Sequence, residues 1–228
     1  MMISRIAAPL VLAALLATGL VACSPAADPK PNTSAEAPAE EEEEEAPEAN
    51  GDFTAAEWAK PVTNPGELLT TVKGTNFQVD IYQVGTEEAS KTGQFVNPDD
   101  NKPIIAVGAE IVYVNYVVTN TSDAEIPLTY SIVDVSARYA DWPYLQGMDS
   151  VVDSAAFEAM KVNSSAIAPN KGEAPFPFAP GTSFSYGQNF LYQAGSPITF
   201  TVALIPSLDN GDLDHDAKQE IKADTKIK

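Results

Sequence analysis

The sequence predicts an all-β domain, built as an antiparallel β-sandwich, behind about fifty residues of different character. Two observations carry this prediction. From Leu68 to Ile227 the chain contains about eight short runs rich in Val, Ile, Tyr, Phe and Thr. Clusters of Gly, Pro, Asn and Asp separate these runs, as turns do between the strands of a sandwich.

The first two runs predict a β-hairpin. They are Leu68–Lys73 and Phe77–Val84, and Gly74-Thr75-Asn76 lies between them. Gly and Asn tolerate the positive φ angles of a three-residue turn. Alternation places the apolar residues on one face, which carries Phe77, Val79 and Ile81. Before the hairpin, Gly51–Pro65 is expected to be a lead-in whose Trp58 docks on the domain.

The strongest predicted strand is Glu110–Thr119, which is apolar on both faces and therefore belongs at the centre of a sheet. Asn115 is the one polar residue in its interior, so we expect this side chain to have a hydrogen-bond partner. The strand ends at the turn Asn120-Thr121-Ser122-Asp123.

The remaining strands differ in their expected positions. Pro127 cannot donate to a ladder, so its strand belongs at an edge. The last run alternates apolar and charged residues and is expected to be an amphipathic edge or outer strand. These strands are Ile126–Thr129, Ser131–Tyr139, Ser183–Tyr192, Ile198–Ile205 and Glu220–Ile227.

One long insertion, Ala140–Gly181, interrupts the strands. Ser150-Val151-Val152-Asp153 resembles a capping box that opens a short helix to about Lys161. Val152, Ala156 and Met160 would form the apolar stripe of that helix, with Phe157 alongside. Four flanking aromatics either cap one end of the sandwich as core or line a groove for a peptide, glycan or apolar ligand. They are Trp142, Tyr144, Phe176 and Phe178.

The N-terminus has the regions of an export signal. Arg5 is followed by the uncharged apolar stretch Ile6–Val21, about 16 residues and too short to cross a bilayer. Leu20-Val21-Ala22-Cys23 resembles the bacterial lipobox, which implies a diacylglyceryl thioether on Cys23 after removal of residues 1–22. The alternative is ordinary signal cleavage near Ala22 or Ala27, with Cys23 incidental. The lipobox hypothesis predicts a lipid anchor on the extracytoplasmic face of the cell membrane.

Residues 23–50 are predicted to be a tether. Ser24–Asn50 is dominated by Pro, Ala and Glu and contains nine carboxylates and one lysine. Such a segment cannot bury enough apolar area to fold, and the six glutamates Glu40–Glu45 keep it extended. We expect a solvated spacer; a weak divalent-cation sponge or a docking tail for a basic partner is the alternative.

The predicted domain, residues 51–228, is acidic as well, with 23 acidic residues against 11 basic ones. This charge argues against nucleic acid as a partner and against an anionic lipid surface. Cys23 is the single cysteine of the chain, so the domain has no disulfide. At this length it needs none.

Two stretches resemble a family of telokin-like immunoglobulin domains found in bacterial lipoproteins. The first is Val107-Gly108, the strand Ile111–Val118 and the turn that follows it. The second is Ala179-Pro180-Gly181-Thr182 before the strand that ends at Phe190-Leu191-Tyr192. The resemblance covers Glu67 to Ile205 and implies an immunoglobulin-like sandwich. It carries over no catalytic residue.

Motifs of catalysis and metal binding are weak. His215 is the single histidine, and no Gly-x-Ser-x-Gly elbow or phosphate-binding glycine loop occurs, so we expect no enzyme and no cofactor. Four aspartates suit calcium as oxygen ligands, but Ala217 stands where the EF-hand spacing requires glycine. These weak calcium candidates are Asp209, Asp212, Asp214 and Asp216, and we predict no metal site there.

The sequence therefore predicts a lipid-anchored, non-catalytic binding or protein-interaction module. Its expected partners are the membrane, through the lipid on Cys23, and an envelope protein, a peptide or a glycan. Two rivals are a solute-binding lipoprotein and an envelope-structural lipoprotein without a small ligand. No motif in the sequence identifies the ligand.

Overall fold

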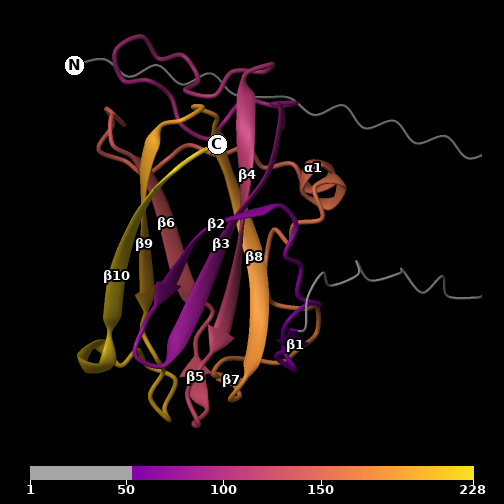
Figure 1. Cartoon of the computed structure of the whole chain (residues 1–228), viewed down its shortest axis with the longest axis vertical. Helices are drawn as coiled ribbons and strands as arrows, with labels where there is room; N and C mark the ends of the chain where they lie inside the picture. The colour runs from indigo at the N-terminus through magenta and orange to yellow at the C-terminus, as the bar shows by residue number, and fades with distance from the viewer. Residues whose placement is uncertain (1–52) are drawn as a thin grey trace, which may run out of the picture. The chain divides into compact units, whose positions relative to one another are not determined.

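Two β-sheets face each other across one apolar interior in the computed structural model, which describes residues 53–228 (Figure 1). These residues belong to the unit Glu44–Lys228. The predicted signal peptide, Cys23 and the tether lie outside the described residues. The prediction of an all-β, antiparallel fold is confirmed, because strands dominate and a single α-helix of six residues is present in the described part.

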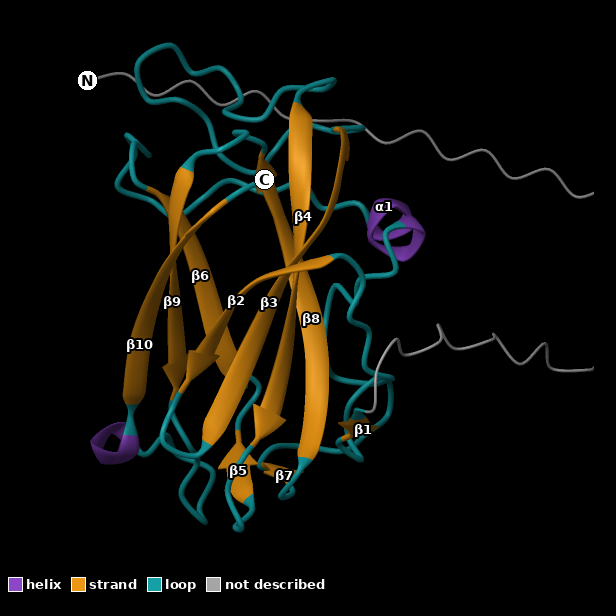
Figure 2. Cartoon of the chain, viewed as in Figure 1, coloured by secondary structure: helices purple, strands orange, loops and turns teal. Residues whose placement is uncertain are grey.

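The larger sheet has five strands in the order β1-β8-β4-β3-β2, and the smaller has three in the order β10-β9-β6 (Figure 2). A separate pair is formed by β5 and β7. All neighbours are antiparallel except β1, which is parallel to β8. The strands are β1 Thr54–Ala55, β2 Glu67–Lys73, β3 Phe77–Glu88, β4 Glu110–Asn120, β5 Ile126–Leu128, β6 Val133–Tyr139, β7 Phe176–Phe178, β8 Thr182–Leu191, β9 Pro197–Leu204 and β10 Gln219–Lys226.

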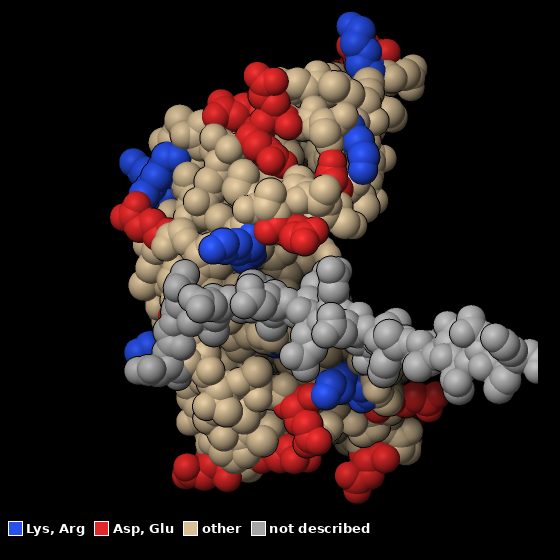
Figure 3. Space-filling model, turned by 90° about the vertical axis from the view of Figure 1, so that its right-hand side faces the viewer, with Lys and Arg blue, Asp and Glu red and all other residues tan. Residues whose placement is uncertain are grey.

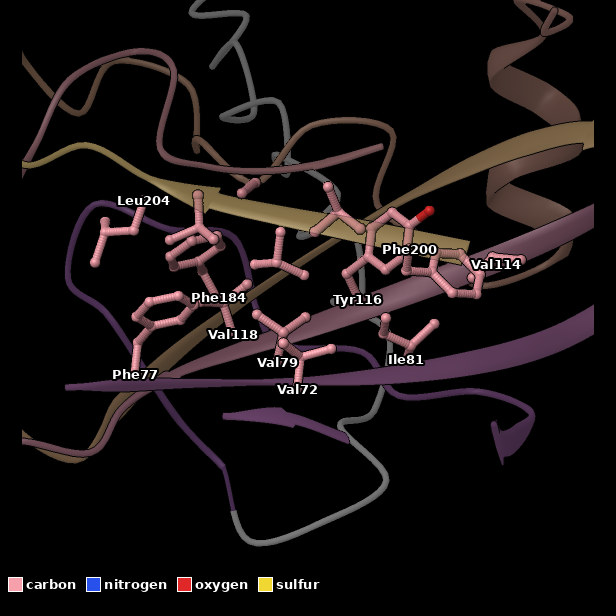
Figure 4. Packing of buried hydrophobic residues seen from close by; sticks show 14 of the residues in the cluster. Val72, Phe77, Val79, Ile81, Val114, Tyr116, Val118, Phe184, Phe200 and Leu204 are labelled. Carbon is pink, nitrogen blue, oxygen red and sulfur yellow. The ribbon is translucent and has the colours of Figure 1, made fainter. Parts of the chain in front are cut away.

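The predicted hairpin is confirmed as β2 and β3, joined by the three residues Gly74-Thr75-Asn76. Phe77, Val79 and Ile81 lie on its buried face, each at most 1% exposed. Figure 4 shows them beside Val114, Tyr116 and Val118 of β4 and facing Phe200 and Leu204 of β9. This layer of side chains between the sheets is the main core.

β4 is central, as predicted, and is buried on both faces. Its inner face belongs to the main core, and its outer face contributes Ile111 and Tyr113 to a second apolar cluster. Ala89, Ile105 and Val151 from loops complete that cluster. Asn115 has the expected partner, since its amide donates to the Thr63 carbonyl at 2.6 Å.

The edge strands also match the sequence. β5 pairs only with β7, and Pro127 stands opposite Pro177. β10 is the edge of the smaller sheet and alternates between half-buried and exposed residues. It lies near β2, where the Thr225 hydroxyl donates to the Leu69 carbonyl at 3.5 Å, so the two sheets meet along this side.

The helix begins later than predicted. α1 spans Ser154–Ala159, and Asp153 is its N-cap, accepting from the N–H groups of Ala155 and Ala156. The prediction that Ser150 opens the helix through a capping box is wrong. That motif needs a Glu or Gln three residues on to reach back, and Asp153 has a shorter side chain that caps its own turn.

The predicted apolar stripe of the helix is partly wrong. Val152 precedes the helix and is 67% exposed. Ala156, Phe157 and Met160 do pack against the second cluster, where the rings of Phe157 and Tyr113 meet edge to face at 5.1 Å between centroids. Between residues 53 and 228 the structure has no helix that combines the length and the apolar character of a membrane span.

Candidate functional site

The four insertion aromatics do not line one groove. Tyr139, at the end of β6, lies near Leu191, whereas β7 lies near Asn120 at the opposite end of the larger sheet. Trp142 and Tyr144 follow Tyr139, and Phe176 and Phe178 form β7. β4 extends from Ile111 opposite Leu191 to Thr119 opposite Ser183, about 26 Å at 3.3 Å per residue. The structure therefore does not bring these four side chains together in one groove.

Phe176 and Phe178 belong to the core at the β5–β7 end. They are 1% and 0% exposed, and Trp58 packs on Phe176 with 5.3 Å between ring centroids. The indole N–H of Trp58 donates to the Pro177 carbonyl at 2.9 Å. The prediction that Trp58 docks on the domain is confirmed, with the ring 3% exposed.

Trp142 and Tyr144 cap the other end. Trp142 is 7% exposed, meets the Tyr144 ring edge to face at 5.2 Å, and donates from its indole to the Gln146 carbonyl at 3.2 Å. The guanidinium of Arg138 donates to the Tyr144 carbonyl at 2.7 Å. Both aromatic pairs thus have structural roles, at opposite ends of the sandwich.

The calcium candidates are not brought together as a metal site. Across residues 53–228, no group of three or more His, Cys, Asp or Glu side chains is arranged to hold a metal ion. Asp214 instead caps the short 3₁₀ helix His215–Ala217, and Asp212 accepts from the Asn210 amide. Asp209 and Asp216 are exposed, as is His215.

A pocket of about 380 Å³ lies elsewhere, in the gap between β6 of the smaller sheet and β8 of the larger one. We call it the side pocket. This volume is within the range of small-molecule sites. Its lining comes from β6, β8, the segment before α1, and α1 itself: Ser136, Ala137, Gly147, Met148, Ser150, Val151, Val152, Asp153, Ser154, Phe157, Ser164, Gly187, Gln188, Asn189 and Phe190.

The segment before α1 is fixed by two buried polar side chains. Asn189 of β8 accepts from the Val151 N–H at 2.8 Å and donates to the Val151 carbonyl at 2.9 Å, as a neighbouring strand would. Asp149 is 1% exposed and accepts from the N–H groups of Gln94, Phe95, Ser150 and Ile105 at 2.7 to 3.2 Å. The pocket wall is therefore held to the larger sheet and to the loop 89–109.

Side chains of β8 and β6 bridge the gap on both sides of the pocket. Tyr186 donates its hydroxyl proton to the Val133 carbonyl at 2.8 Å, and the Gln188 amide donates to the Val135 carbonyl at 3.0 Å. Farther along, Tyr139 of β6 donates to the Leu191 carbonyl at 3.0 Å. Burial raises the pKa of Tyr186 and of Tyr139 above the usual 10.0, so both phenols stay neutral donors.

The pocket is nearly free of charge. Asp153 is its one ionisable lining residue, and this carboxylate is engaged by the Ser90 hydroxyl and by the N-terminus of α1. The hydrogen bond from Ser90 is the main cause that lowers the pKa of Asp153, and Lys91, with its Nζ 3.7 Å away, adds to it. Figure 3 views the molecule from the side of α1 and β8, where basic side chains stand singly among acidic ones.

The lining suits recognition of a neutral group with both donors and acceptors. Serine hydroxyls, amides and strand backbone surround the apolar side chains of Val151, Phe157 and Phe190. Sequence reasoning missed this site because its walls come from strands of two different sheets. The usable signal was the run Gly187-Gln188-Asn189, three consecutive polar or small residues between Tyr186 and Phe190 of one strand.

Comparisons with known proteins assign no family to the chain. No protein-family model matches the chain, and no curated protein matches it. Similar solved structures include a candidate lipoprotein (ycdA) from Bacillus subtilis, 16% identical with a TM-score of 0.37, where the match covers 70% of this chain and 39% of that one. Another is a functionally unknown protein from Listeria monocytogenes, 13% identical with a TM-score of 0.39, covering 72% and 85%.

The chain therefore spans well under half of the first of these proteins. At these TM-scores neither likeness assigns a family or a function. The resemblance to telokin-like immunoglobulin domains stays a prediction.

Proposed function

We propose that the chain is a lipid-anchored, extracytoplasmic binding domain that is not an enzyme and that holds its ligand in the side pocket. The observation that carries this proposal is the pocket itself: about 380 Å³, open between two sheets, with neutral polar groups around apolar walls. Its volume is within the range of ligand sites, and placed polar groups such as these orient a ligand in its site.

The absence of catalysis in this proposal rests on the chemistry of the lining. Serines are present, but a serine nucleophile needs an adjacent base, and the pocket has no histidine or lysine. Asp153 accepts hydrogen bonds from Ser90 and from the first turn of α1, so this carboxylate has a structural role as the cap of the helix. His215 lies on the 3₁₀ helix before β10 and does not line the pocket.

The anchor in this proposal rests on Leu20-Val21-Ala22-Cys23. Two acyl chains hold a protein on a membrane stably, whereas one chain holds it only reversibly. Replacing Cys23 with Ser should move the chain from the membrane fraction to the soluble fraction after cell fractionation. Retention of C23S in the membrane fraction would place the anchor elsewhere in the chain.

The pocket can be tested with a blocking variant. Gly147 lines the pocket, is exposed, and has nothing within 4 Å of where a Cβ would stand, so Gly147→Trp fills the mouth without a backbone clash. Leu145→Trp is the matched control, because Leu145 is 98% exposed in the same loop and does not line the pocket.

The probes are a capped tripeptide, an N-acetylated disaccharide and an unsubstituted neutral disaccharide, added to the full chain carrying C23S. We expect at least one of them to shift the amide resonances of pocket residues, and we expect G147W, but not L145W, to abolish the shifts. If none of the three probes perturbs the pocket, or if G147W binds as well as the parent, the proposed function is refuted.

A second candidate is an envelope-structural lipoprotein without a small ligand. The observation that favours it is the burial of Trp142, Phe176 and Phe178, which removes the aromatic groove from the possible binding surfaces. A solute-binding lipoprotein that serves a transporter is a special case of the binding proposal. Cross-linking and pull-down from intact cells separates these candidates. Recovery of a transporter subunit would support the solute-binding lipoprotein, recovery of another envelope protein would support an interaction module, and recovery of no partner would support the structural lipoprotein.

A further inference from the structure

The free edge of β6 turns specific backbone groups toward the side pocket. β6 is the last strand of its sheet, after β10 and β9. Just beyond it, the Ala140 N–H donates to the Pro197 carbonyl, so even-numbered residues of this strand pair with β9. Because N–H and C=O groups alternate in direction along an antiparallel strand, Val133, Val135 and Ala137 direct theirs away from β9.

Two of these three residues are engaged by β8. The carbonyls of Val133 and Val135 accept from Tyr186 and Gln188. At Ala137, which lines the pocket, the N–H donates no hydrogen bond to residues 53–228 and the carbonyl accepts none from them. On this edge of β6, the carbonyls of Val133 and Val135 therefore have partners on β8, whereas the carbonyl of Ala137 has none in the described residues.

The edge of β8 that faces away from β4 also has backbone groups without a partner in the described residues. The Gly187 N–H donates to the Asn163 carbonyl, so odd-numbered residues of β8 direct their backbone groups away from β4. The Leu191 carbonyl accepts from Tyr139. Between these two contacts lies Asn189, whose side chain is bound to Val151 but whose backbone N–H and carbonyl have no partner in the described chain.

Ala137 and Asn189 both line the side pocket, so a chain extended through the pocket can reach the open backbone groups of both strands. Paired strands lie about 4.8 Å apart. Successive residues of a strand direct their N–H and C=O groups to opposite sides, so one residue can pair with Ala137 and the next with Asn189.

Resting on the proposed function, we propose that the ligand of the side pocket is an extended peptide segment that pairs as a strand with Ala137 of β6 and Asn189 of β8. The cavity of about 380 Å³ equals the liquid volume of about a dozen water molecules, which is room for two or three small residues. Addition of a strand to an exposed sheet edge is a general mode of peptide recognition.

The lining also selects among peptides. Val151, Phe157 and Met148 form an apolar wall for one side chain of the segment. The one carboxylate, Asp153, and the acidic charge of the domain disfavour acidic segments, so neutral or basic ones fit. A sugar presents hydroxyls around a ring instead of N–H and C=O groups alternating on two sides, and it matches this lining less well.

The test uses the C23S full chain and acetyl-Ala-Val-Ala-amide, followed by shifts of the amide resonances of Ala137 and Asn189. The matched probe carries an N-methyl group on the central valine, which removes one donor and obstructs pairing with little change elsewhere. Loss of a hydrogen bond to a buried partner predicts binding at least about tenfold weaker for the N-methylated peptide. Equal binding of both peptides would overturn strand pairing.

A variant tests the same bonds from the protein side. Ala137→Pro removes the N–H of Ala137, which is outside the β6–β9 ladder, and proline is tolerated where an edge N–H faces away from the sheet. Ala137→Gly keeps the N–H and is the control. We expect A137P to lose peptide binding by about tenfold or more and A137G to keep it; binding by A137P that equals A137G would overturn the assignment.

The thermal unfolding curve of A137P shows whether this variant folds. If it does not, the comparison of the N-methylated and unmodified peptides alone tests strand pairing. The sugars distinguish the two proposals. A disaccharide that binds in the pocket while the peptide does not would overturn the peptide inference and leave the proposed function standing. Failure of every probe overturns both.

Discussion

Asp149 is predicted to be the most sensitive polar residue of the domain. It is a buried carboxylate, 1% exposed, and within residues 53–228 no Lys, Arg or His forms an ion pair with it. Its charge is instead satisfied by four backbone N–H groups. Oδ1 accepts from Gln94 at 2.7 Å, Ser150 at 2.9 Å and Phe95 at 3.0 Å, and Oδ2 accepts from Ile105 at 3.2 Å.

Asp149→Ala removes all four acceptor contacts at once. Ile105 is 0% exposed, so its N–H has no route to water and costs about 1–3 kcal/mol when left unpaired. The other three donors lie nearer the surface and lose about 0.5–1.5 kcal/mol each. The substitution also removes the free-energy cost of burying a charged carboxylate, which offsets part of this loss. We expect a net destabilisation of about 3–5 kcal/mol.

The assay is thermal and urea unfolding of the full chain carrying C23S. For a domain of this size, 1 kcal/mol shifts Tm by about 2–4 °C, so the D149A variant should unfold about 6–20 °C below the parent. Asp99→Ala is the control, since Asp99 is exposed in the loop that Asp149 holds and its carboxylate makes no hydrogen bond with residues 53–228.

A second variant disturbs the Asp149 carboxylate from the neighbouring loop. A Cβ placed on Gly93 would overlap the Asp149 carboxylate, so Gly93→Ala should destabilise the domain in the same direction. Hydrogen exchange at the Ile105 amide should accelerate in both variants. If D149A stays within about 1 kcal/mol of D99A, the four N–H contacts are worth little and the reasoning is refuted.

Further predictions concern the aromatic ends and the helix cap. Trp58→Ala should cost about 3–5 kcal/mol, and Trp142→Ala about 2–4 kcal/mol because Trp142 is 7% exposed against 3% for Trp58, both measured by urea unfolding. A W142A variant of unchanged stability would contradict its assignment to the core. The pKa of Asp153 is lowered by Ser90, so its cap contact adds stability above the ordinary pKa of 3.8 and is lost as pH falls below that value. The α1 amide resonances should therefore be constant from pH 7 to about 4.5 and change only under more acidic conditions. Asp153→Asn should remove that pH dependence, and an equal acid transition in D153N would assign it to another group.

Much of the fold could be predicted from local sequence pattern. β4 was identifiable because apolar residues occupy both of its faces, and β10 because charge occupies one. The β2–β3 turn followed from Gly74-Thr75-Asn76. These signals are local, since each depends only on residues within one strand or one turn.

The insertion could not be predicted in the same way. Trp142 and Phe178 are in one insertion, yet that insertion runs from the end of β6 to the start of β8, along the length of the sandwich. The side pocket was hidden for a related reason. Ala137 and Asn189 are ordinary strand residues, and only the pairing of β6 with β9 and of β8 with β4, together with the pocket that both residues line, distinguishes them.

The short strand β1 also has a mechanical consequence. It pairs in parallel with the start of β8, the Ala56 N–H donates to the Ser183 carbonyl at 2.8 Å, and Trp58 follows with its ring between Phe176 and Phe184. Tension applied to the chain at Phe53 is resisted first by this pairing and next by the buried indole. We therefore expect β1 and Trp58 to yield under such tension before the contacts that hold the pocket wall through Asp149 and Asn189.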